Sequence, residues 1–322
     1  MSAITVAGAG AFGTALAIAL AGAGRDVTLW ARDNTAARAM EMTRHNGKYL
    51  PDAPLPDRLH VTDNPDSLAR AEIILLAIPA QNLRAFITSY SDKLAQKTCV
   101  ICCKGVERES GLLPPDLMRL LLPEADIAVL TGPGFATEIA AGLPTALTLA
   151  ATGAGADALQ ARLSTATLRL YLSHDLIGAA LGGALKNVVA IGCGLTIGAG
   201  LGESARAALM TRGYAEIRRL AVAMGAEAAT LSGLSGLGDL ALTCGSKKSR
   251  NFSLGYRLGA NEAQPRNITV EGVATARACL TLAKAQGVEM PIAEIVTQVL
   301  DGALDIPAAA NALLSRPLTA ER

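Results

Sequence analysis

The residue with the most unusual surroundings in this chain is Lys186. It is the only charged residue between Leu176 and Gly202, in a run dominated by alanine, leucine and glycine. Burying an ammonium group is costly, so a buried lysine tends to lose its proton and its pKa falls toward neutrality. A lysine with such a pKa can exchange protons with a substrate at physiological pH. The alternatives are a lysine that extends to water or one paired with a buried acid.

Two more charged residues and one charged segment stand where they could contact a ligand. Lys104 follows the strand-like run 99–103, a position from which an ammonium group can meet an anionic or carbonyl oxygen. Asp239, in the glycine-rich turn 236–240, either balances the charge of a lysine or caps a helix. The segment 247–251 (KKSRN) suits phosphate, because arginine binds two oxygens at once. The alternatives are a solvated lysine at position 104 and a solvated loop at 247–251.

The segment 8–13 (GAGAFG) matches the G-x-G-x-x-G pattern of a dinucleotide-binding turn. It directly follows the predicted strand 4–7 and opens a predicted helix, the context that makes the pattern specific. In such a turn Gly8 allows the tight bend, Gly10 the close approach of a pyrophosphate, and Gly13 the packing of helix on sheet. The N–H groups at the helix start then face the anion. A glycine-rich turn without a ligand is the alternative.

The residues after the second predicted strand, 27–30, bear on the choice of cofactor. An acid there binds the ribose 2′-hydroxyl of NAD, whereas an arginine suits the 2′-phosphate of NADP. Arg32 lies nearest the strand end and favours NADP, while Asp33 keeps NAD possible. The alternative is that both are ordinary surface charges.

The elements that must position these residues change in kind along the chain. Strands are predicted at 4–7, 27–30, 59–61, 73–78, 99–103, 127–130, 146–150 and 168–172. Helices between them are predicted at 11–23, 35–46, 81–93 and 115–121. This alternation predicts an α/β fold, a Rossmann-type doubly wound parallel sheet covered on both faces, with ligands at the carboxyl ends of its strands.

After His174 the strand-like runs stop. The remaining predicted helices are at 181–191, 204–224, 274–286 and 292–300. We therefore predict two domains with a cleft between them. Residues 1–177 would form a dinucleotide-binding Rossmann-like domain, and residues 178–322 an all-helical substrate-binding and catalytic domain.

Composition argues against several other classes of protein. The chain has 29 lysines and arginines and 28 aspartates and glutamates, so nothing favours a nucleic acid or an anionic membrane surface as partner. The run 176–202 is long enough to span a membrane, but its eight glycines and central lysine favour a helix buried in protein. We therefore expect no stable membrane insertion.

The N-terminus lacks a signal-peptide pattern, and six cysteines lie among apolar residues, as in reduced cytosolic proteins. We expect a cytoplasmic location. Cys99 and Cys102 match C-x-x-C, but they fall in a strand-like run and would face opposite sides, so we interpret them as packing residues. The three histidines lie away from cysteines and acidic clusters, so no metal site is predicted.

Together these motifs resemble one family over nearly the whole chain, the bacterial-type NAD(P)-dependent glycerol-3-phosphate dehydrogenases. The resemblance rests on segments 8–14 (GAGAFGT), 49–51 (YLP), 103–105 (CKG), 132–136 (GPGFA), 182–190 (GGALKNVVA), 236–244 (GLGDLALTC), 249–251 (SRN) and 270–272 (VEG), in this order. It implies reversible reduction of dihydroxyacetone phosphate to sn-glycerol 3-phosphate by hydride transfer, which supplies glycerophospholipid synthesis.

The resemblance also implies roles for individual residues. Lys186 would be the catalytic proton donor and acceptor. The substrate-binding residues would be Lys104, Gly132, Lys186, Asp239, Ser249, Arg250 and Asn251. The cofactor-binding residues, which include the three turn glycines, would be Gly8, Gly10, Ala11, Phe12, Gly13, Arg32, Lys104, Ala136, Arg250 and Glu271. Family members often have serine or threonine where this chain has Gly134. If that side-chain hydroxyl binds the ligand in those proteins, a backbone N–H group must take its place in this chain.

We expect NADP as the preferred cofactor, with NAD as the alternative, a small phosphorylated substrate, and a homodimer. Two other functions stay open. Another two-domain NADP-dependent reductase, acting on a small carbonyl acid, would need a carboxylate clamp rather than the phosphate-binding segment 249–251. A non-catalytic NADP-binding sensor would bind the cofactor without turnover.

Overall fold

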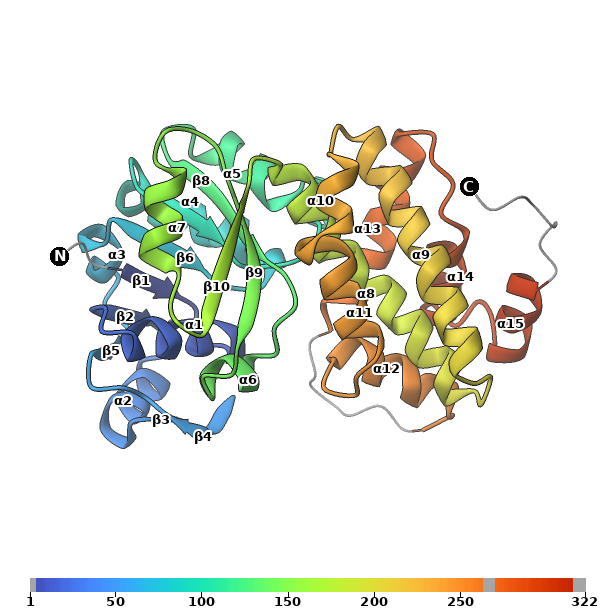
Figure 1. Ribbon diagram of the computed structural model, residues 1–322, viewed down its shortest axis with the longest axis horizontal. Helices are drawn as coiled ribbons and strands as arrows, with labels where there is room; N and C mark the ends of the chain where they lie inside the picture. Colours follow the sequence, from blue (N-terminus) through green and yellow to red (C-terminus); the bar gives the residue numbers. More distant parts are fainter. Residues whose placement is uncertain (1–3, 263–269, 315–322) are drawn as a thin grey trace.

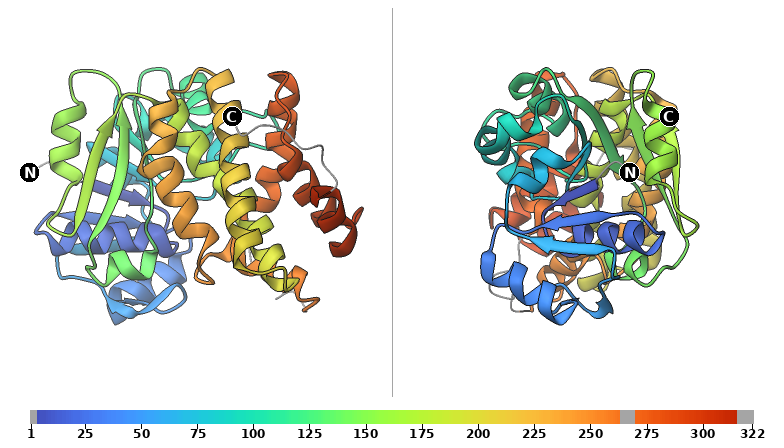
Figure 2. Two further views of the ribbon diagram at one scale, coloured as in Figure 1. Left: turned by 45° about the vertical axis from the view of Figure 1, so that its right-hand side comes forward. Right: turned by 90° about the vertical axis from the view of Figure 1, so that its left-hand side faces the viewer.

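The two halves of the chain differ in architecture, and the helix α8 (Leu176–Gly198) begins where they meet. The computed structural model describes residues 4–262 and 270–314. Strands and helices alternate in the N-terminal half, and a helical domain follows (Figure 1). Two further views show the sheet at one end of the molecule and the helices gathered at the other (Figure 2).

Within the described residues, the main sheet has eight strands in the order β10-β9-β8-β7-β6-β1-β2-β5. They are β1 (Ile4–Ala7), β2 (Val27–Trp30), β5 (Leu59–Thr62), β6 (Ile73–Leu76), β7 (Thr98–Ile101), β8 (Asp126–Thr131), β9 (Thr145–Ala151) and β10 (Leu168–Ser173). Each predicted strand is therefore present, with ends shifted by two residues at most. The mostly parallel, doubly wound sheet is confirmed.

The prediction of a fully parallel sheet is wrong at one pairing, because β9 runs antiparallel to β8. The connection between them stays at the carboxyl end of the sheet. Its short helix α6 (Ala136–Ala140) packs against α1 (Ala11–Gly22) instead of crossing a face of the sheet. The chain therefore re-enters beside β8 in the opposite direction, and β10 then pairs parallel to β9.

A second, two-stranded sheet was not predicted. It pairs β3 (His45–Asn46) with β4 (Leu50–Pro54) in antiparallel fashion. The helix predicted over 35–46 ends early, as α2 (Asn34–Thr43), because Arg44 adopts a left-handed φ of 55°. A left-handed residue stops a helix and redirects the chain, here into β3.

Helices cover both faces of the main sheet. The other N-terminal helices are α3 (Asp66–Arg70), η1 (Ala80–Asn82), α4 (Leu83–Leu94), α5 (Pro114–Leu121) and α7 (Ala156–Leu163). The C-terminal domain contains, after α8, the helices α9 (Glu203–Ala223), α10 (Ala228–Ser232), η2 (Leu234–Gly238), α11 (Asp239–Cys244), α12 (Arg250–Gly259), α13 (Glu271–Ala285), α14 (Pro291–Leu300) and α15 (Ile306–Leu314). The short turn η2 is a π-helix.

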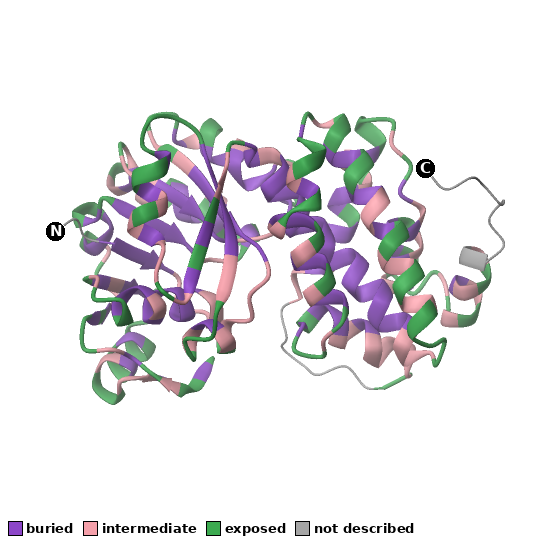
Figure 3. Cartoon of the chain, viewed as in Figure 1, coloured by how far each residue is buried: buried purple, intermediate pink, exposed green. Residues whose placement is uncertain are grey.

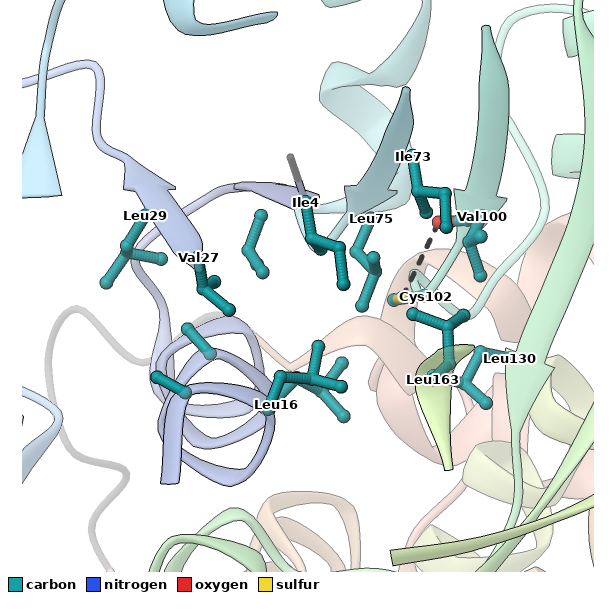
Figure 4. Close-up of a cluster of buried hydrophobic side chains, with 14 of the residues drawn as sticks. Ile4, Leu16, Val27, Leu29, Ile73, Leu75, Val100, Cys102, Leu130 and Leu163 are labelled. Atoms are coloured by element: carbon teal, nitrogen blue, oxygen red, sulfur yellow. Dashed lines mark hydrogen bonds between the residues drawn. The ribbon is translucent and has the colours of Figure 1, made fainter. Parts of the chain in front are cut away.

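Alternation along the buried strands explains the two-sided core. Ile73 and Leu75 of β6 pack on one face with Leu16 of α1 (Figure 4), while the residues between and after them pack on the opposite face. Successive side chains of a strand point to opposite faces, so an unbroken apolar run needs cover on both. Cys102 belongs to the first cluster and Cys99 to the second, which confirms their interpretation as packing residues.

The helix α8 crosses the centre of the C-terminal domain and is buried along almost its whole length (Figure 3). It has 23 residues, and Asp175 caps it by accepting a hydrogen bond from Gly178 N at 2.7 Å. Among the described residues it alone is long and apolar enough to cross a membrane, and 89% of its apolar window is buried inside the protein. This burial favours a core helix, as the sequence predicted.

Glycines bring α8 and α12 into backbone contact. A Cβ added to Gly194 would lie 2.0 Å from the carbonyl oxygen of Phe252, and one added to Gly255 would lie 2.0 Å from that of Ile191. No other residue fits at such distances, because side-chain atoms would overlap the facing backbone. This contact holds the first turns of α12 beside the C-terminal third of α8.

Replacing Gly194 by alanine tests this close packing. We expect Gly194→Ala to lower the free energy of unfolding by about 1–3 kcal/mol, because the new methyl group must push the two helices apart. The measurement is the urea midpoint followed by circular dichroism at 222 nm. Gly22→Ala is the matched control: Gly22 is also helical, but a Cβ there meets no described atom within 4 Å. That variant should be neutral or slightly more stable; equal losses in both would contradict the packing argument.

Candidate active site

A buried carboxylate lies between two lysines where the sheet meets the helical domain. Asp239 Oδ2 accepts a hydrogen bond from Lys104 Nζ at 2.6 Å, and Asp239 Oδ1 accepts one from Lys186 Nζ. Lys104 follows β7, Lys186 belongs to α8, and Asp239 is the first residue of α11. The exposed fraction is 7% for Lys186 and 1% for Asp239. Lys186 is therefore paired with an acid rather than extended to water, and Asp239 balances charge instead of capping α11.

The charges in this cluster set the protonation of Lys186. Burial lowers its pKa to about 8, against the attraction of Asp239 and with the added repulsion of Lys104. Burial alone would raise the pKa of Asp239, but the two ammonium groups outweigh it and hold that pKa below its usual range. Asp239 therefore stays ionised near neutral pH, while Lys186 can gain or lose its proton there.

Thr243 completes the surroundings of Lys186, and our sequence reasoning missed it. The hydroxyl of Thr243 accepts a hydrogen bond from Lys186 Nζ at 2.7 Å. Thr243 lies four residues after Asp239 on α11, so the two side chains share one face of that helix. This spacing within the segment 236–244 is a pattern from which the role of Thr243 could have been predicted. With two fixed acceptors, the Lys186 nitrogen has one defined position.

Two successive glycines on α8 make room for the cluster. A Cβ on Gly182 would lie 2.6 Å from the carbonyl oxygen of Ser235 in η2. A Cβ on Gly183 would lie 2.6 Å from the hydroxyl of Thr131 at the end of β8. Both the π-helical turn before Asp239 and the tip of the sheet can therefore approach α8 closely.

A cleft of about 660 Å³ opens beside Lys104. Among the described residues, its ionisable lining consists of six basic side chains and one acid: Lys104, Arg108, Lys247, Lys248, Arg250, Arg257 and Glu271. Lys104 both lines this cleft and contacts Asp239, so the buried cluster lies directly behind it. A larger hollow of about 840 Å³ lies beside α4. None of the predicted site residues is among the described residues that line it.

The first turn of α12 borders the cleft. Ser249 caps this helix, accepting a hydrogen bond from Phe252 N at 3.2 Å, and Arg250 lines the cleft. Asn251 is buried and accepts a hydrogen bond from Gly272 N at 3.0 Å, which ties α12 to α13. Ser249 and Asn251 are thus ordered parts of a helix start, where backbone N–H groups and an arginine favour anions.

Glu271, the first residue of α13, is half-buried in the same cleft. Burial raises its pKa, and the positive charges of Arg250, Lys104 and Lys186 work against that rise. The carboxyl group therefore shares an electrostatic environment with the predicted substrate-binding cations.

The glycine turn fits a dinucleotide. Gly8 has a φ of 113°, and a Cβ there would lie 2.6 Å from the carbonyl oxygen of Ala77. A Cβ on Gly13 would lie 2.1 Å from the carbonyl oxygen of Gly8, whereas one on Gly10 meets no described atom within 4 Å. The first and third glycines are thus required by close contacts, and the second leaves an open approach to the start of α1.

The predicted cofactor and substrate residues divide into two groups. Lys104 Nζ lies 6.0 Å from the centre of the Phe12 ring beside Ala11, and 3.5 Å from the carbonyl oxygen of Gly132. Ala136, at the start of α6, packs in the same small apolar cluster as Ala11 and Phe12. Arg32 is exposed at the end of β2, away from the buried cluster of charges.

Local structure accounts for two further residues that the sequence analysis singled out, Asp33 and Gly134. Asp33 caps α2, accepting a hydrogen bond from Ala36 N at 3.0 Å, so its carboxylate is already engaged. A Cβ on Gly134 would lie 3.0 Å from Ile139 Cδ1 and 3.1 Å from Thr145 Cγ2. A side chain at position 134 would therefore press on both neighbours.

Comparison with known proteins gives matches along nearly the whole chain. The family model described as NAD-dependent glycerol-3-phosphate dehydrogenase N-terminus matches residues 3–156, and the corresponding C-terminus model matches residues 175–311. The chain is 56% identical to the glycerol-3-phosphate dehydrogenase (NAD(P)+) of Ruegeria sp. strain TM1040 over 322 residues, covering 99% of each. It is 53% identical to the protein of the same name from Roseobacter denitrificans over 319 residues, again covering 99% of each.

A solved structure is similar throughout. The crystal structure of glycerol-3-phosphate dehydrogenase from Coxiella burnetii superposes with a TM-score of 0.93 at 35% identity. The match covers 98% of this chain and 99% of that one. Both halves of the fold are thus shared, in the same arrangement.

Neutralising Asp239 tests the charge balance of the cluster. We expect Asp239→Asn to lower the free energy of unfolding at pH 7 by about 3–5 kcal/mol, because it leaves two lysines without their buried counter-charge. The loss should shrink as the pH rises from 7 through about 8, the pKa of Lys186 in the parent protein, because above that pH both proteins bury a neutral amine and gain the same proton on unfolding. Urea unfolding between pH 7 and 10 measures both effects.

Asp57→Asn provides the control for this change, because Asp57 is exposed. That variant should stay within about 0.5 kcal/mol of the parent protein. A loss in Asp239→Asn that does not depend on pH would show that hydrogen bonding, rather than charge, stabilises the cluster.

Proposed function

This chain belongs to the NAD-dependent glycerol-3-phosphate dehydrogenase family, and from that premise we propose that it interconverts dihydroxyacetone phosphate and sn-glycerol 3-phosphate. NADPH, or NADH as the alternative, is the hydride source of this reaction. The observation that carries the proposal is the Lys104–Asp239–Lys186 cluster behind a cleft rich in cations. A lysine with a pKa near 8 beside a phosphate-binding surface suits the reduction of a phosphorylated ketone.

The proton step follows from the position of Lys186. A nicotinamide cofactor, held by the glycine turn with Ala11 and Phe12, would supply the hydride chemistry at C2 of the substrate. Lys186 gives its proton to the C2 oxygen during reduction and takes one back during oxidation. Asp239 and Thr243 hold the Lys186 nitrogen in place, and the ammonium of Lys104 stabilises negative charge that develops on the oxygen.

The phosphate group of the substrate would lie at the first turn of α12. Arg250 offers two hydrogen bonds in one plane, the geometry of a phosphate edge. Ser249 and Asn251 hold this turn in shape through their own hydrogen bonds. Gly132 adds its backbone on the sheet side, beside Lys104. An enzyme for a non-phosphorylated carbonyl acid would not need this turn.

The cofactor residues would act at separate points along the dinucleotide. The glycine turn, with Ala11 and Phe12, would receive the pyrophosphate at the start of α1. Arg32 would contact the 2′-phosphate of NADP, while Ala136 and Glu271 would lie toward the nicotinamide end. Because the Asp33 carboxylate already caps α2, NADP is the preferred cofactor in this proposal.

Further features of the proposal concern organisation. The division into domains 1–177 and 178–322 is supported by the two family models, which match residues 3–156 and 175–311. A cytoplasmic location is supported by six cysteines that are all free. A homodimer would cover exposed apolar side chains such as Leu201 and Val222 near the two ends of α9. Sedimentation at several concentrations tests that state.

The assay that tests the function follows NADPH absorbance on addition of dihydroxyacetone phosphate. We expect turnover in the parent protein and a loss of about 10²–10⁴-fold in kcat for Lys186→Ala, the range for a missing general acid. NADPH binding, measured by fluorescence, should persist in this variant. The control is Lys284→Ala, an exposed lysine on α13. Cofactor binding without turnover in the parent protein would favour the sensor function.

The same assay has an expected pH dependence in each direction. Reduction needs protonated Lys186, so kcat/KM for the ketone should be constant below pH 8 and fall above it. Oxidation needs the neutral amine, so kcat/KM for the alcohol should rise up to pH 8 and then level off. If kcat/KM changed with pH in the same sense in both directions, Lys186 would not be the proton carrier.

The cofactor preference makes a separate prediction. We expect Arg32→Ala to lower kcat/KM for NADPH by about 10–100-fold, since a charge-assisted hydrogen bond is worth about 1.5–3 kcal/mol. The value for NADH should change by less than about twofold, because NADH lacks the phosphate. Arg70→Ala, at another exposed arginine of the sheet half, serves as control. Equal losses with both cofactors would show that Arg32 does not contact the 2′-phosphate.

A further inference from the structure

The charge of the cleft differs sharply from that of the whole chain. The sequence has 29 basic and 28 acidic residues, so the protein is almost neutral. The described lining of the cleft nevertheless has six basic residues and one acidic residue. A random share of the surface would not separate the signs in this way, so the cleft carries a local positive field.

The proposed chemistry uses only part of that charge. Lys104 and Arg250 belong to the substrate site, and Lys248 forms an ion pair with Glu138 at 2.7 Å, which offsets its charge. The cations left unassigned in the described lining are Arg108, Lys247 and Arg257. We call these three residues the outer rim.

The outer rim lies on two walls of the cleft. Arg257 follows Arg250 by seven residues on α12, and with Ser253 and Leu254 between them these residues form one helix face that lines the cleft. Lys247 precedes the same helix, its Nζ 3.7 Å from the centre of the Tyr256 ring. That aromatic face attracts the ammonium group and helps to hold it in position.

The third member of the outer rim comes from the other wall. Arg108 lies in the loop after β7, and its backbone N–H donates to Gln81 Oε1 at 3.0 Å. Gln81 also donates to the carbonyl oxygen of Val106 at 2.7 Å, so its side chain holds the loop at Val106 and at Arg108. Positive charge therefore faces the cleft from both the sheet half and the helical domain.

We propose that Arg108, Lys247 and Arg257 draw the dianionic phosphorylated substrate into the cleft by long-range attraction, a role that rests on the proposed function. A phosphate monoester carries a charge of about −1.5 to −2 at pH 7. A cleft lined by the opposite charge concentrates such ligands, and this attraction extends over about one Debye length. The outer rim thus acts at long range, without a fixed contact to the bound substrate.

Ionic strength separates long-range capture from direct contact. The test variant combines Arg108→Gln, Lys247→Gln and Arg257→Gln. The control variant combines Arg169→Gln, Arg212→Gln and Lys284→Gln, which removes the same charge from exposed residues outside the described cleft lining. Steady-state kinetics with dihydroxyacetone phosphate at saturating NADPH give kcat and kcat/KM between 0.01 and 1 M salt.

We expect the rim variant to lose about tenfold in kcat/KM at 0.01 M salt while kcat stays within about twofold. The loss should vanish at 1 M salt, where the Debye length falls from about 30 Å to about 3 Å. The control variant should follow the parent protein at every salt concentration.

Three outcomes would overturn the capture role. Equal losses in the rim and control variants would show an effect of net charge alone. A loss that persists at 1 M salt would show a short-range contact, and a parallel fall in kcat would show an effect on the bound complex. A parent protein without any turnover would instead overturn the proposed function, so the two failures are distinguishable.

Discussion

The arrangement of the site depends on one buried carboxylate that faces two lysines. Asp239 can balance only one of the two ammonium groups, so the cluster holds an excess positive charge in a place with little water. Such an excess is relieved when a lysine gives up its proton or when negative charge arrives next to it. Burial lowers the pKa of Lys186, the more deeply buried lysine, to about 8, and the repulsion of Lys104 adds to that effect against the attraction of Asp239. The constraint that shapes the cluster therefore also makes it suited to moving a proton onto a developing alkoxide.

Backbone proximity makes this cluster possible, and glycine makes the proximity possible. Gly182 and Gly183 allow η2 and the tip of β8 to approach α8 just before Lys186. Further along, Gly194 faces α12 at a distance that excludes a side chain. The long helix α8 thus carries Lys186 and is also the common surface against which the helices α11, with Asp239, and α12, with Arg250, pack. A chain with so few aromatic residues builds this core from closely packed backbones instead of large side chains.

Two kinds of electrostatics operate in different parts of the molecule. In the proposed function, anion binding at the glycine turn relies on backbone N–H groups at the start of α1, where Gly10 leaves the approach open. In the cleft, it relies on side-chain charge from both halves of the chain. Arg32 is exposed just after β2, which pairs with β1 beside the glycine turn, and in the proposed function it reads the charge by which the two nicotinamide cofactors differ. The groups proposed for phosphate binding, proton transfer and cofactor choice therefore come from different elements of the fold.

The sequence by itself determined the local features: strand positions such as β1 and β2, the dinucleotide turn, the change from strands to helices, and most of the residues that carry charge near the site. These follow from short-range periodicity and from motifs a few residues long. It did not determine that β9 runs antiparallel, that α8 continues through its glycines to Gly198, or that Thr243 contacts Lys186. Lys104 and Asp239 are 135 residues apart in the chain, and no local pattern sets the distance between them. Only the tertiary structure decided that contact, because it depends on how the helices of the C-terminal domain pack against the carboxyl ends of the central strands.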